Sequence, residues 1–234
     1  MNETAKNLDS PSPSDHYLGA SGAKYFEWQE EMGKLTGELE APKFRSYISR
    51  DHHVLDFGCG GGYVLRSLEC SRRVGVEVNP AARTCAEMLG IECYDSLHKV
   101  DDDSFDVIIS NHALEHVPFP IEVLRTARRK LKPSGTLVLC VPIDDWRAQR
   151  KYNAGDINHH LNTWTPQLLG NSLVEAGFKP SEFSIRILSH AWFGRIARVR
   201  ERIPKPLFDF LCYLCAVVIK RRQLIAVAKR TSEI

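Results

Sequence analysis

The sequence has little net charge of either sign. Its 31 lysines and arginines stand against 29 aspartates and glutamates, so the formal charge is +2 over 234 residues. Proteins that hold nucleic acid through its phosphates need a strongly basic surface. No general attraction to nucleic acid is therefore expected, and any basic patch must be local.

The cysteines also lack the pattern of a disulfide framework. The seven cysteines are scattered through apolar contexts, and an odd number argues against a disulfide framework. Cys212 and Cys215 form a C-x-x-C pair, but neither a second pair nor a pair of histidines accompanies it. Because a structural zinc site takes four protein ligands, we interpret these two as core thiols.

The sequence also lacks a secretion signal and a membrane-spanning run. Residues 1–19 do not show the positively charged and then apolar pattern that directs secretion, which predicts a cytoplasmic protein. The most apolar stretch, residues 207–219, is shorter than the about 20 residues with which a helix crosses a bilayer.

Two segments precede the part of the chain in which strands and helices alternate. Residues 1–16 are rich in serine, proline, aspartate and asparagine and are predicted to be a disordered lead-in. Residues 17–50 are predicted to be a helical segment, with one helix over 23–39 and a short second helix over 44–48.

From residue 51 onward the hydrophobic pattern changes repeatedly between that of a strand and that of a helix. This alternation predicts an α/β fold in which a parallel sheet is covered by helices on both faces. We expect a core over 51–190, a helical insertion over 191–221 and a last strand of the core over 222–234. Strands are predicted at 53–58, 74–78, 91–95, 105–111, 136–141, 183–188 and 222–230, and helices at 63–70, 80–89, 120–131 and 165–178.

The first of these strands runs into a glycine turn, VLDFGCGGGYVL. A dinucleotide-binding turn has the spacing G-x-G-x-x-G, but here Tyr63 stands at the third glycine position after Gly58 and Gly60. Asp56, two residues upstream, would repel a pyrophosphate. A ligand that carries an ammonium and a sulfonium and no phosphate would favour that carboxylate. S-adenosylmethionine is such a ligand.

Glu77 closes the second predicted strand about 20 residues further along. An acid at this point can accept hydrogen bonds from both hydroxyls of a ribose. The feature suits any adenosine cofactor, so it does not separate S-adenosylmethionine from NAD. A plain surface carboxylate at the end of a strand is the alternative interpretation.

The order of VLDFGCGGG, VGVEVNP, SFDVIISNHALEHV and KPSGTLVLCVP resembles the class I S-adenosylmethionine-dependent methyltransferases. It is most similar to the small-molecule type, which includes quinone-biosynthesis and polysaccharide-locus enzymes. The resemblance covers residues 51–142 and extends through 159–178. It implies a Rossmann-like, seven-stranded sheet that is mostly parallel with an antiparallel last strand, and S-adenosylmethionine as the cofactor.

The resemblance also implies a cofactor site, position by position. The glycine turn would border the methionine end of the cofactor, and the acid that closes the second strand would bind the ribose. The residue after that acid would contact the adenine ring. The loop after the third strand would lie near the adenine amino group. The end of the fourth strand would complete the site. The residues concerned are Asp56, Gly58, Cys59, Gly60, Glu77, Val78, Asp95, Ser96, Asn111 and His112.

Methyl transfer from a sulfonium is an in-line displacement at an activated carbon, so the protein must position the acceptor and, for a hydroxyl, remove its proton. Two loops supply candidate bases, NHALEHVPFP at 111–120 and NHHLNTW at 158–164. The candidate catalytic residues are His116, His160 and Glu115. Packing or capping at the end of a strand is the alternative role for such residues.

The spacing H-x-x-E-H at residues 112–116 also matches a metalloprotease signature. That signature needs a helix that presents its ligands on one face, and a further acid downstream. Here Pro118 and Pro120 follow at once. We therefore predict no metal site.

A basic and apolar segment over residues 195–222 is not explained by the methyltransferase resemblance. Basic residues precede and follow the apolar stretch. The segment is expected to be a lid or a homodimer contact, or a peripheral contact with the inner face of a membrane. The basic residues are Arg195, Arg198, Arg200, Arg202, Lys205, Lys220, Arg221 and Arg222.

The sequence thus predicts a methyltransferase that acts on oxygen or carbon of a small or lipid-linked acceptor, such as a sugar or a quinone-like molecule. A catalytically silent binding module of the same fold is one alternative. An NAD-dependent dehydrogenase is the other, against which Asp56 and the absent third glycine both count. The acceptor itself is not identified by the sequence.

Overall fold

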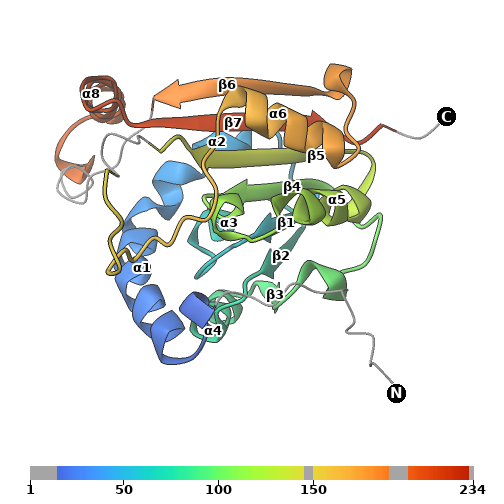
Figure 1. Ribbon diagram of the computed structural model, residues 1–234, viewed down its shortest axis with the longest axis horizontal. Coiled ribbons are helices and arrows are strands. Elements are labelled where there is room, and N and C mark those ends of the chain that lie inside the picture. The colour runs from blue at the N-terminus through green and yellow to red at the C-terminus, as the bar shows by residue number, and fades with distance from the viewer. Residues whose placement is uncertain (1–14, 145–149, 190–199, 232–234) are drawn as a thin grey trace.

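The computed structural model describes residues 15–144, 150–189 and 200–231, and within these ranges seven strands form one sheet (Figure 1). The strand order is β3-β2-β1-β4-β5-β7-β6. Only β7 runs antiparallel, and it pairs with β5 on one side and β6 on the other. The predicted Rossmann-like fold is confirmed. The strands are β1 (His53–Phe57), β2 (Arg72–Val76), β3 (Glu92–Tyr94), β4 (Phe105–Asn111), β5 (Leu131–Pro142), β6 (Phe183–Ser189) and β7 (Arg222–Lys229).

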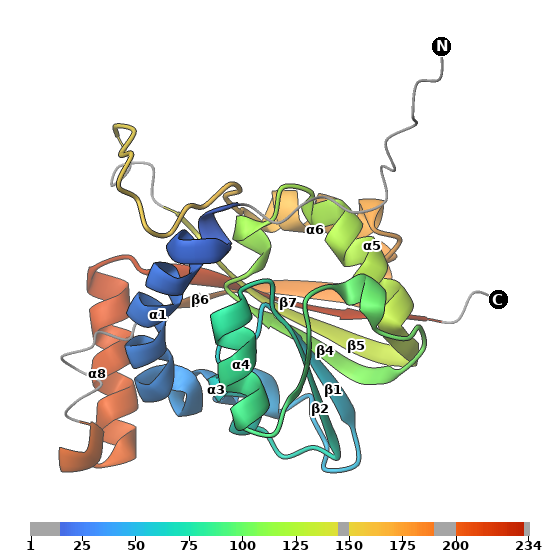
Figure 2. The same ribbon diagram turned by 90° about the horizontal axis from the view of Figure 1, so that it is seen from below.

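Helices cover both faces of the sheet, because side chains of a strand point alternately to its two faces. On β1, Val54 faces a core that includes Phe44 and Leu65, whereas Leu55 faces a second core that includes Leu124 and Leu169. Figure 2 shows α3 and α4 on the first face and α5 and α6 on the other. The helices are α1 (Gly19–Glu40), α2 (Pro42–Arg45), α3 (Tyr63–Arg66), α4 (Pro80–Met88), α5 (Pro120–Lys130), α6 (Pro166–Glu175) and α8 (Lys205–Val218).

Most helix boundaries follow local signals. Proline occupies the first turn of α4, α5 and α6, where its missing N–H costs nothing. The Asn79 side chain caps α4 by accepting a hydrogen bond from the Ala81 N–H at 3.0 Å, and Thr165 caps α6 through the Leu168 N–H at 3.1 Å. Gly177, at φ +97°, turns the chain after α6.

Several predicted boundaries were wrong, and four of the larger differences are these. The helix predicted over 23–39 begins four residues earlier, and the one predicted over 44–48 is only the single turn of α2. The helix predicted over 63–70 ends at Arg66, after which the Ser67 hydroxyl donates to the Tyr63 carbonyl at 2.9 Å. Strand β5 begins at Leu131 rather than at residue 136, because Leu131 already pairs with Phe105 of β4 before an irregularity in the register.

Helix α1 crosses directly over the glycine turn because two of its residues lack a side chain. A Cβ at Gly33 would lie 2.7 Å from the Tyr63 ring, and one at Gly37 would lie 2.6 Å from the Tyr63 Cβ. Helix α8 runs beside α1 on its outer side (Figure 2). Within the described ranges, none of the helices combines the length and the hydropathy needed to cross a membrane. The lead-in predicted over 1–16 lies almost wholly outside those ranges.

Candidate active site

A cavity lies between α1 and the carboxyl ends of β1 and β4, which is the edge where parallel α/β sheets bind their ligands. Its walls come from the glycine turn after β1, from the end of β4, and from the face of α1 that includes Phe26, Gly33 and Glu40. Six residues of the predicted cofactor site line this one cavity. They are Asp56, Gly58, Cys59, Gly60, Asn111 and His112.

The glycine turn keeps its shape only without side chains at its bends. Gly58 and Gly60 have φ angles of +72° and +52°, a region that favours glycine. A Cβ at Gly58 would overlap the Cβ of Ala113 at the end of β4. The turn is anchored to β2, since the Gly58 N–H donates to the Val76 carbonyl at 2.8 Å. The backbone can therefore approach a ligand closely.

Asp56 is a buried carboxylate that lacks a full set of partners. It is 2% exposed, and its Oδ1 atom has no hydrogen-bond partner among the described residues. Burial raises its pKa well above the usual range, and the nearby Glu77 raises it further. A buried acid of this kind favours a cationic ligand, which would restore its charged form. The ammonium of S-adenosylmethionine fits this requirement.

Glu77 is tied to the glycine turn. Its Oε2 accepts the Gly60 N–H at 2.9 Å, and its Oε1 accepts the Asn79 N–H at 2.8 Å. The half-buried carboxylate is thus fixed at the point where the chain leaves β2. This arrangement supports the predicted ribose contact over a plain surface carboxylate.

The predicted adenine end lies beyond the cavity, at the ends of β2 and β3. The carbonyl of Val78 accepts a hydrogen bond from Arg83 at 2.9 Å. Asp95 pairs with Lys99 through Oδ2 at 2.8 Å, but its Oδ1 is buried and has no partner among the described residues. The Ser96 hydroxyl already accepts the His98 N–H at 3.2 Å. Of the two candidates for the adenine amino group, Asp95 therefore has the acceptor atom to offer.

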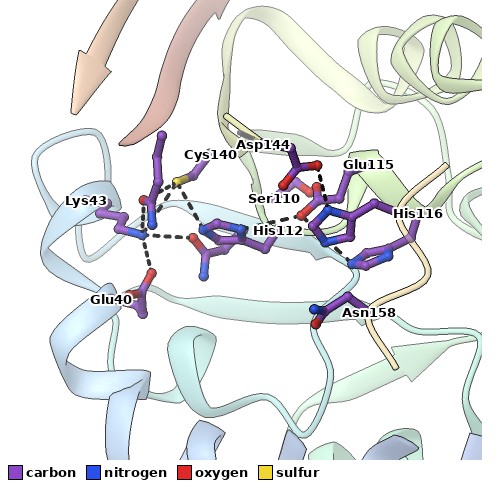
Figure 3. Close-up of polar contacts among 12 residues, drawn as sticks. Glu40, Lys43, Ser110, His112, Glu115, His116, Cys140, Asp144 and Asn158 are labelled. Atoms are coloured by element: carbon purple, nitrogen blue, oxygen red, sulfur yellow. Dashed lines mark hydrogen bonds and ion pairs between the residues drawn. The ribbon is translucent and has the colours of Figure 1, made fainter. Parts of the chain in front are cut away.

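The three predicted catalytic residues converge at the same edge of the sheet, and Figure 3 shows Glu115 and His116 there. Glu115 and His116 belong to a single 3₁₀ turn after β4 (Leu114–His116), and one polar atom each of Glu115, His116 and His160 lies within 4.8 Å of the others. Backbone hydrogen bonds hold the two loops together, because the N–H groups of Leu161 and Asn162 donate to the Glu115 carbonyl at 2.9 and 3.0 Å.

Glu115 is the electrostatic centre of this cluster. It is 0% exposed, and neither carboxylate oxygen has a hydrogen-bond partner among the described residues. The His112 Nδ1 lies 3.4 Å from Oε1. Burial disfavours the charged form of His112, but contacts with Cys140 and Glu115 outweigh it and raise the pKa of His112 to about 10. A protonated His112 therefore balances the Glu115 charge. His112 also holds a φ of +56°, a strained conformation typical of functional sites.

His116 is held as a neutral imidazole. The Tyr17 hydroxyl lies 2.8 Å from Nδ1 of His116 and donates to the Asn158 carbonyl at 3.2 Å. The other ring nitrogen, Nε2, lies 3.9 Å from the Glu115 carboxylate. Burial lowers the pKa of His116 below its usual value, although Glu115 opposes this. His116 can therefore accept a proton near neutral pH.

A family model described as a methyltransferase domain matches residues 26–182, which is more than half of the chain. The chain belongs to this family. Its members in class I use S-adenosylmethionine, the cofactor that the turn and Asp56 suit. The seven-stranded sheet and the order of the motifs place this methyltransferase in that class.

The similar curated proteins share one enzyme name. The ubiquinone biosynthesis O-methyltransferase of Nitrosococcus oceani is 27% identical over 153 residues, which cover 58% of this chain and 63% of that protein. The enzyme of the same name from Roseobacter denitrificans is 31% identical over 175 residues, which cover 60% and 68%. The methyltransferase thus matches roughly two thirds of the length of each of these relatives.

Solved structures share the fold at low identity. A possible histamine N-methyltransferase from Thermotoga maritima is 16% identical with a TM-score of 0.62, covering 89% of this chain and 96% of that one. A complex of the Haloferax volcanii Trm112 activator with a methyltransferase matches with 18% identity and a TM-score of 0.64, covering 95% of this chain and all of the matched chain. These likenesses show the fold alone.

Two side chains that hold the candidate catalytic residues in place were missed by the sequence analysis. Tyr17 belongs to a 3₁₀ turn before α1 and reaches His116 across 99 residues of sequence. Asp144 follows β5 and accepts the Nδ1–H of His160 at 2.8 Å. Burial disfavours the charged form of His160, but Asp144 outweighs it, so the pKa of His160 is raised. The position of Asp144 after a parallel strand was a usable signal, whereas nothing local marked Tyr17.

His159 does not join the cluster. It stacks on His16 with ring centroids 4.6 Å apart. Of the histidines on the two loops, the methyltransferase brings His112, His116 and His160 to Glu115, and it turns His159 away.

A buried lysine contacts Glu40 and Asn111, two residues that line the cavity. Lys43 of α2 forms an ion pair with Glu40 and donates to Gln223 Oε1 at 2.8 Å and to Asn111 Oδ1 at 3.4 Å. Burial disfavours its charge, but Glu40 outweighs it, so the pKa of Lys43 lies above its usual value. The network joins α1 and α2 to the ends of β4 and β7, and through Asn111 it reaches the lining of the cavity. Figure 3 shows Lys43 between Glu40 and Cys140. The sequence analysis missed this network.

Proposed function

We propose that this methyltransferase methylates a hydroxyl-bearing acceptor that is small or lipid-linked, such as a quinone-like phenol or a sugar. One observation carries the proposal: the His116 ring, whose pKa is lowered by burial, places Nε2 3.9 Å from the buried Glu115 at the carboxyl edge of the sheet. Methylation at oxygen, or at the carbon beside a phenol, needs the removal of a hydroxyl proton. The relatives named as O-methyltransferases of ubiquinone biosynthesis support the same class of acceptor.

In this proposal each side chain has one task. His116 accepts the hydroxyl proton at Nε2, and Glu115 stabilises the imidazolium that forms. Tyr17 and Asp144 hold His116 and His160 in orientation through their Nδ1 atoms. When bound, S-adenosylmethionine supplies a methyl group on a positively charged sulfur. Asp56 and Glu77 position that group, and the burial of Glu115 excludes water from the cluster.

The same cluster favours a second version, in which a divalent cation assists. One ring nitrogen each of His116 and His160 converges with a carboxylate oxygen of Glu115 within 4.8 Å. Their outer nitrogens are fixed by Tyr17 and Asp144, the way in which metal-binding histidines are usually oriented. This set differs from the H-x-x-E-H helix considered in the sequence, because it uses His160 and needs no helix. The prediction that no metal is bound stays a prediction.

A transfer assay tests the proposed function and separates its two versions. Purified protein is incubated with methyl-labelled S-adenosylmethionine and either a dihydroxy-aromatic acceptor or its fully methoxylated analogue. We expect label on the first acceptor only, with no effect of EDTA. Loss with EDTA and recovery with Mg²⁺ would assign the cation-assisted version. Binding of cofactor without transfer to any hydroxyl, or transfer to amines alone, would contradict the proposal.

The predicted location and partners belong to the same proposal. A lipid-linked acceptor would bring the chain to the inner face of a membrane through the segment 195–222, which the sequence also offers as a homodimer contact. Of its basic residues, Arg195 and Arg198 lie outside the described ranges. No role for nucleic acid is proposed.

A further inference from the structure

Helix α8 exposes an apolar side. Its buried side is narrow and consists of Phe208, Cys212 and Ala216, which are spaced four residues apart. Five apolar residues lie on the opposite side and are 38–77% exposed. The last four follow the first at spacings of three, four, seven and eleven residues. These residues define the α8 face: Leu207, Phe210, Leu211, Leu214 and Val218.

Nothing polar interrupts the α8 face. The charged residues of the helix are Lys205 and Asp209, and they form an ion pair with each other. A helix that packs on a protein core and is otherwise solvated carries polar residues on its outer side. An outward apolar surface of this kind marks an interaction site.

The segment around the α8 face is basic, although the whole chain is nearly neutral. Residues 200–222 contain six basic and two acidic residues, a net formal charge of +4, whereas the whole chain carries +2. Arg202 precedes the helix, and Lys220 and Arg222 follow it, all with exposed side chains. Basic side chains at both ends of an apolar helix suit a helix that lies flat on an anionic bilayer.

We propose that the α8 face docks on an anionic lipid surface, with the helix parallel to the bilayer plane. Charge decides between a membrane and a second copy of the chain. A two-fold contact through α8 would bring two segments of net charge +4 together, and these would repel each other. An anionic surface instead complements the charge.

This docking brings the cofactor cavity close to the bilayer. Helix α1 lies between α8 and the rest of the fold (Figure 2), and its residues Gly33 and Glu40 line the cavity. Arg200, just before α8, donates to the α1 carbonyl of Leu35 at 3.1 Å and pairs with Glu38 at 3.3 Å. The reason for docking, access to a lipid-linked acceptor, rests on the proposed function.

Vesicle co-sedimentation of the full chain tests the docking. The vesicles are phosphatidylcholine alone or phosphatidylcholine mixed with phosphatidylglycerol. We expect binding to the mixed vesicles at low salt, and at least a roughly tenfold loss in the double variant Phe210→Glu, Leu214→Glu. Leu168→Glu, Val174→Glu is the matched control, because these exposed apolar residues lie on α6. The charge variant Arg202→Gln, Lys220→Gln should bind about fivefold more weakly per charge removed.

Three outcomes would overturn the docking proposal. They are no binding to anionic vesicles at low salt, equal losses in the α8 and α6 double variants, and a dimer in solution that Phe210→Glu, Leu214→Glu converts to a monomer. The last outcome would assign the α8 face to a second copy. Failure here stays distinct from failure of the proposed function, which is measured as label transfer to a water-soluble acceptor.

Discussion

His116→Asn is expected to lower kcat for a hydroxyl acceptor by about 10²- to 10⁴-fold, the range for loss of a general base. The reason is the state of the ring: its Nδ1 is bound by Tyr17, its pKa is lowered by burial, and its Nε2 lies 3.9 Å from Glu115. Asparagine keeps a polar group near Tyr17 but cannot take the proton. Single-turnover transfer of a labelled methyl group measures the effect, and calorimetry should show cofactor affinity within about twofold of the parent.

The matched control is His159→Asn on the neighbouring loop. His159 stacks on His16 and does not reach Glu115, so its loss should change kcat only by the small factor usual for residues outside a site. Equal rates in the two variants would remove His116 from the proposed mechanism. Rescue of the His116→Asn rate at high pH, where the acceptor ionises by itself, would support its role as the base.

Glu77→Ala is expected to weaken S-adenosylmethionine binding by about 10- to 100-fold. Hydrogen bonds to a charged group contribute about 1.5–3 kcal/mol each. The variant would lose the hydrogen bonds between the Glu77 carboxylate and the ribose. The substitution would also release the glycine turn, because the native carboxylate holds that turn by accepting the Gly60 N–H at 2.9 Å. Titration calorimetry with S-adenosylmethionine and its demethylated product gives both affinities, and both should fall.

Glu92→Ala is the control for this variant. Glu92 lies on β3 and pairs with Arg72 at the surface, so cofactor affinity should be unchanged. Asp56→Asn completes the set. It removes the negative charge facing the ammonium and should weaken binding, while the free chain should become more stable because a buried, incompletely paired carboxylate is lost. Unchanged affinity in both Glu77→Ala and Asp56→Asn would overturn the assigned cofactor site.

The sheet and the cofactor turn were predictable because their signals are local. A buried parallel strand reads as a short apolar run, and the glycine, proline, asparagine and threonine positions mark where strands and helices end. Asp56 lies at the end of β1 and Glu77 directly follows β2. Because these parallel strands share an edge, the placement of both acids at the glycine turn followed from the topology. The boundaries of α3 and β5 depended instead on a side-chain hydrogen bond and on strand pairing, which no local pattern contains.

The support of the catalytic cluster was not predictable for a different reason. Tyr17 meets His116 across 99 residues, and Lys43 meets Gln223 across 180. Such contacts arise only when α1 and α2 pack over the sheet edge. That packing depends on Gly33 and Gly37, which leave room for Tyr63, and the sequence alone does not show that these residues meet. The sequence indicated which residue types could do the chemistry, and the tertiary structure shows which of them are held in place to do it.

Calorimetric titration of the purified chain with S-adenosylmethionine, its demethylated product and NADH tests the central claim most directly. The glycine turn, the incompletely paired Asp56 and the anchored Glu77 predict micromolar binding of the first two, about −8 kcal/mol, and no heat with NADH. Binding of NADH without S-adenosylmethionine would contradict the cofactor assignment, and the proposed methyl transfer with it.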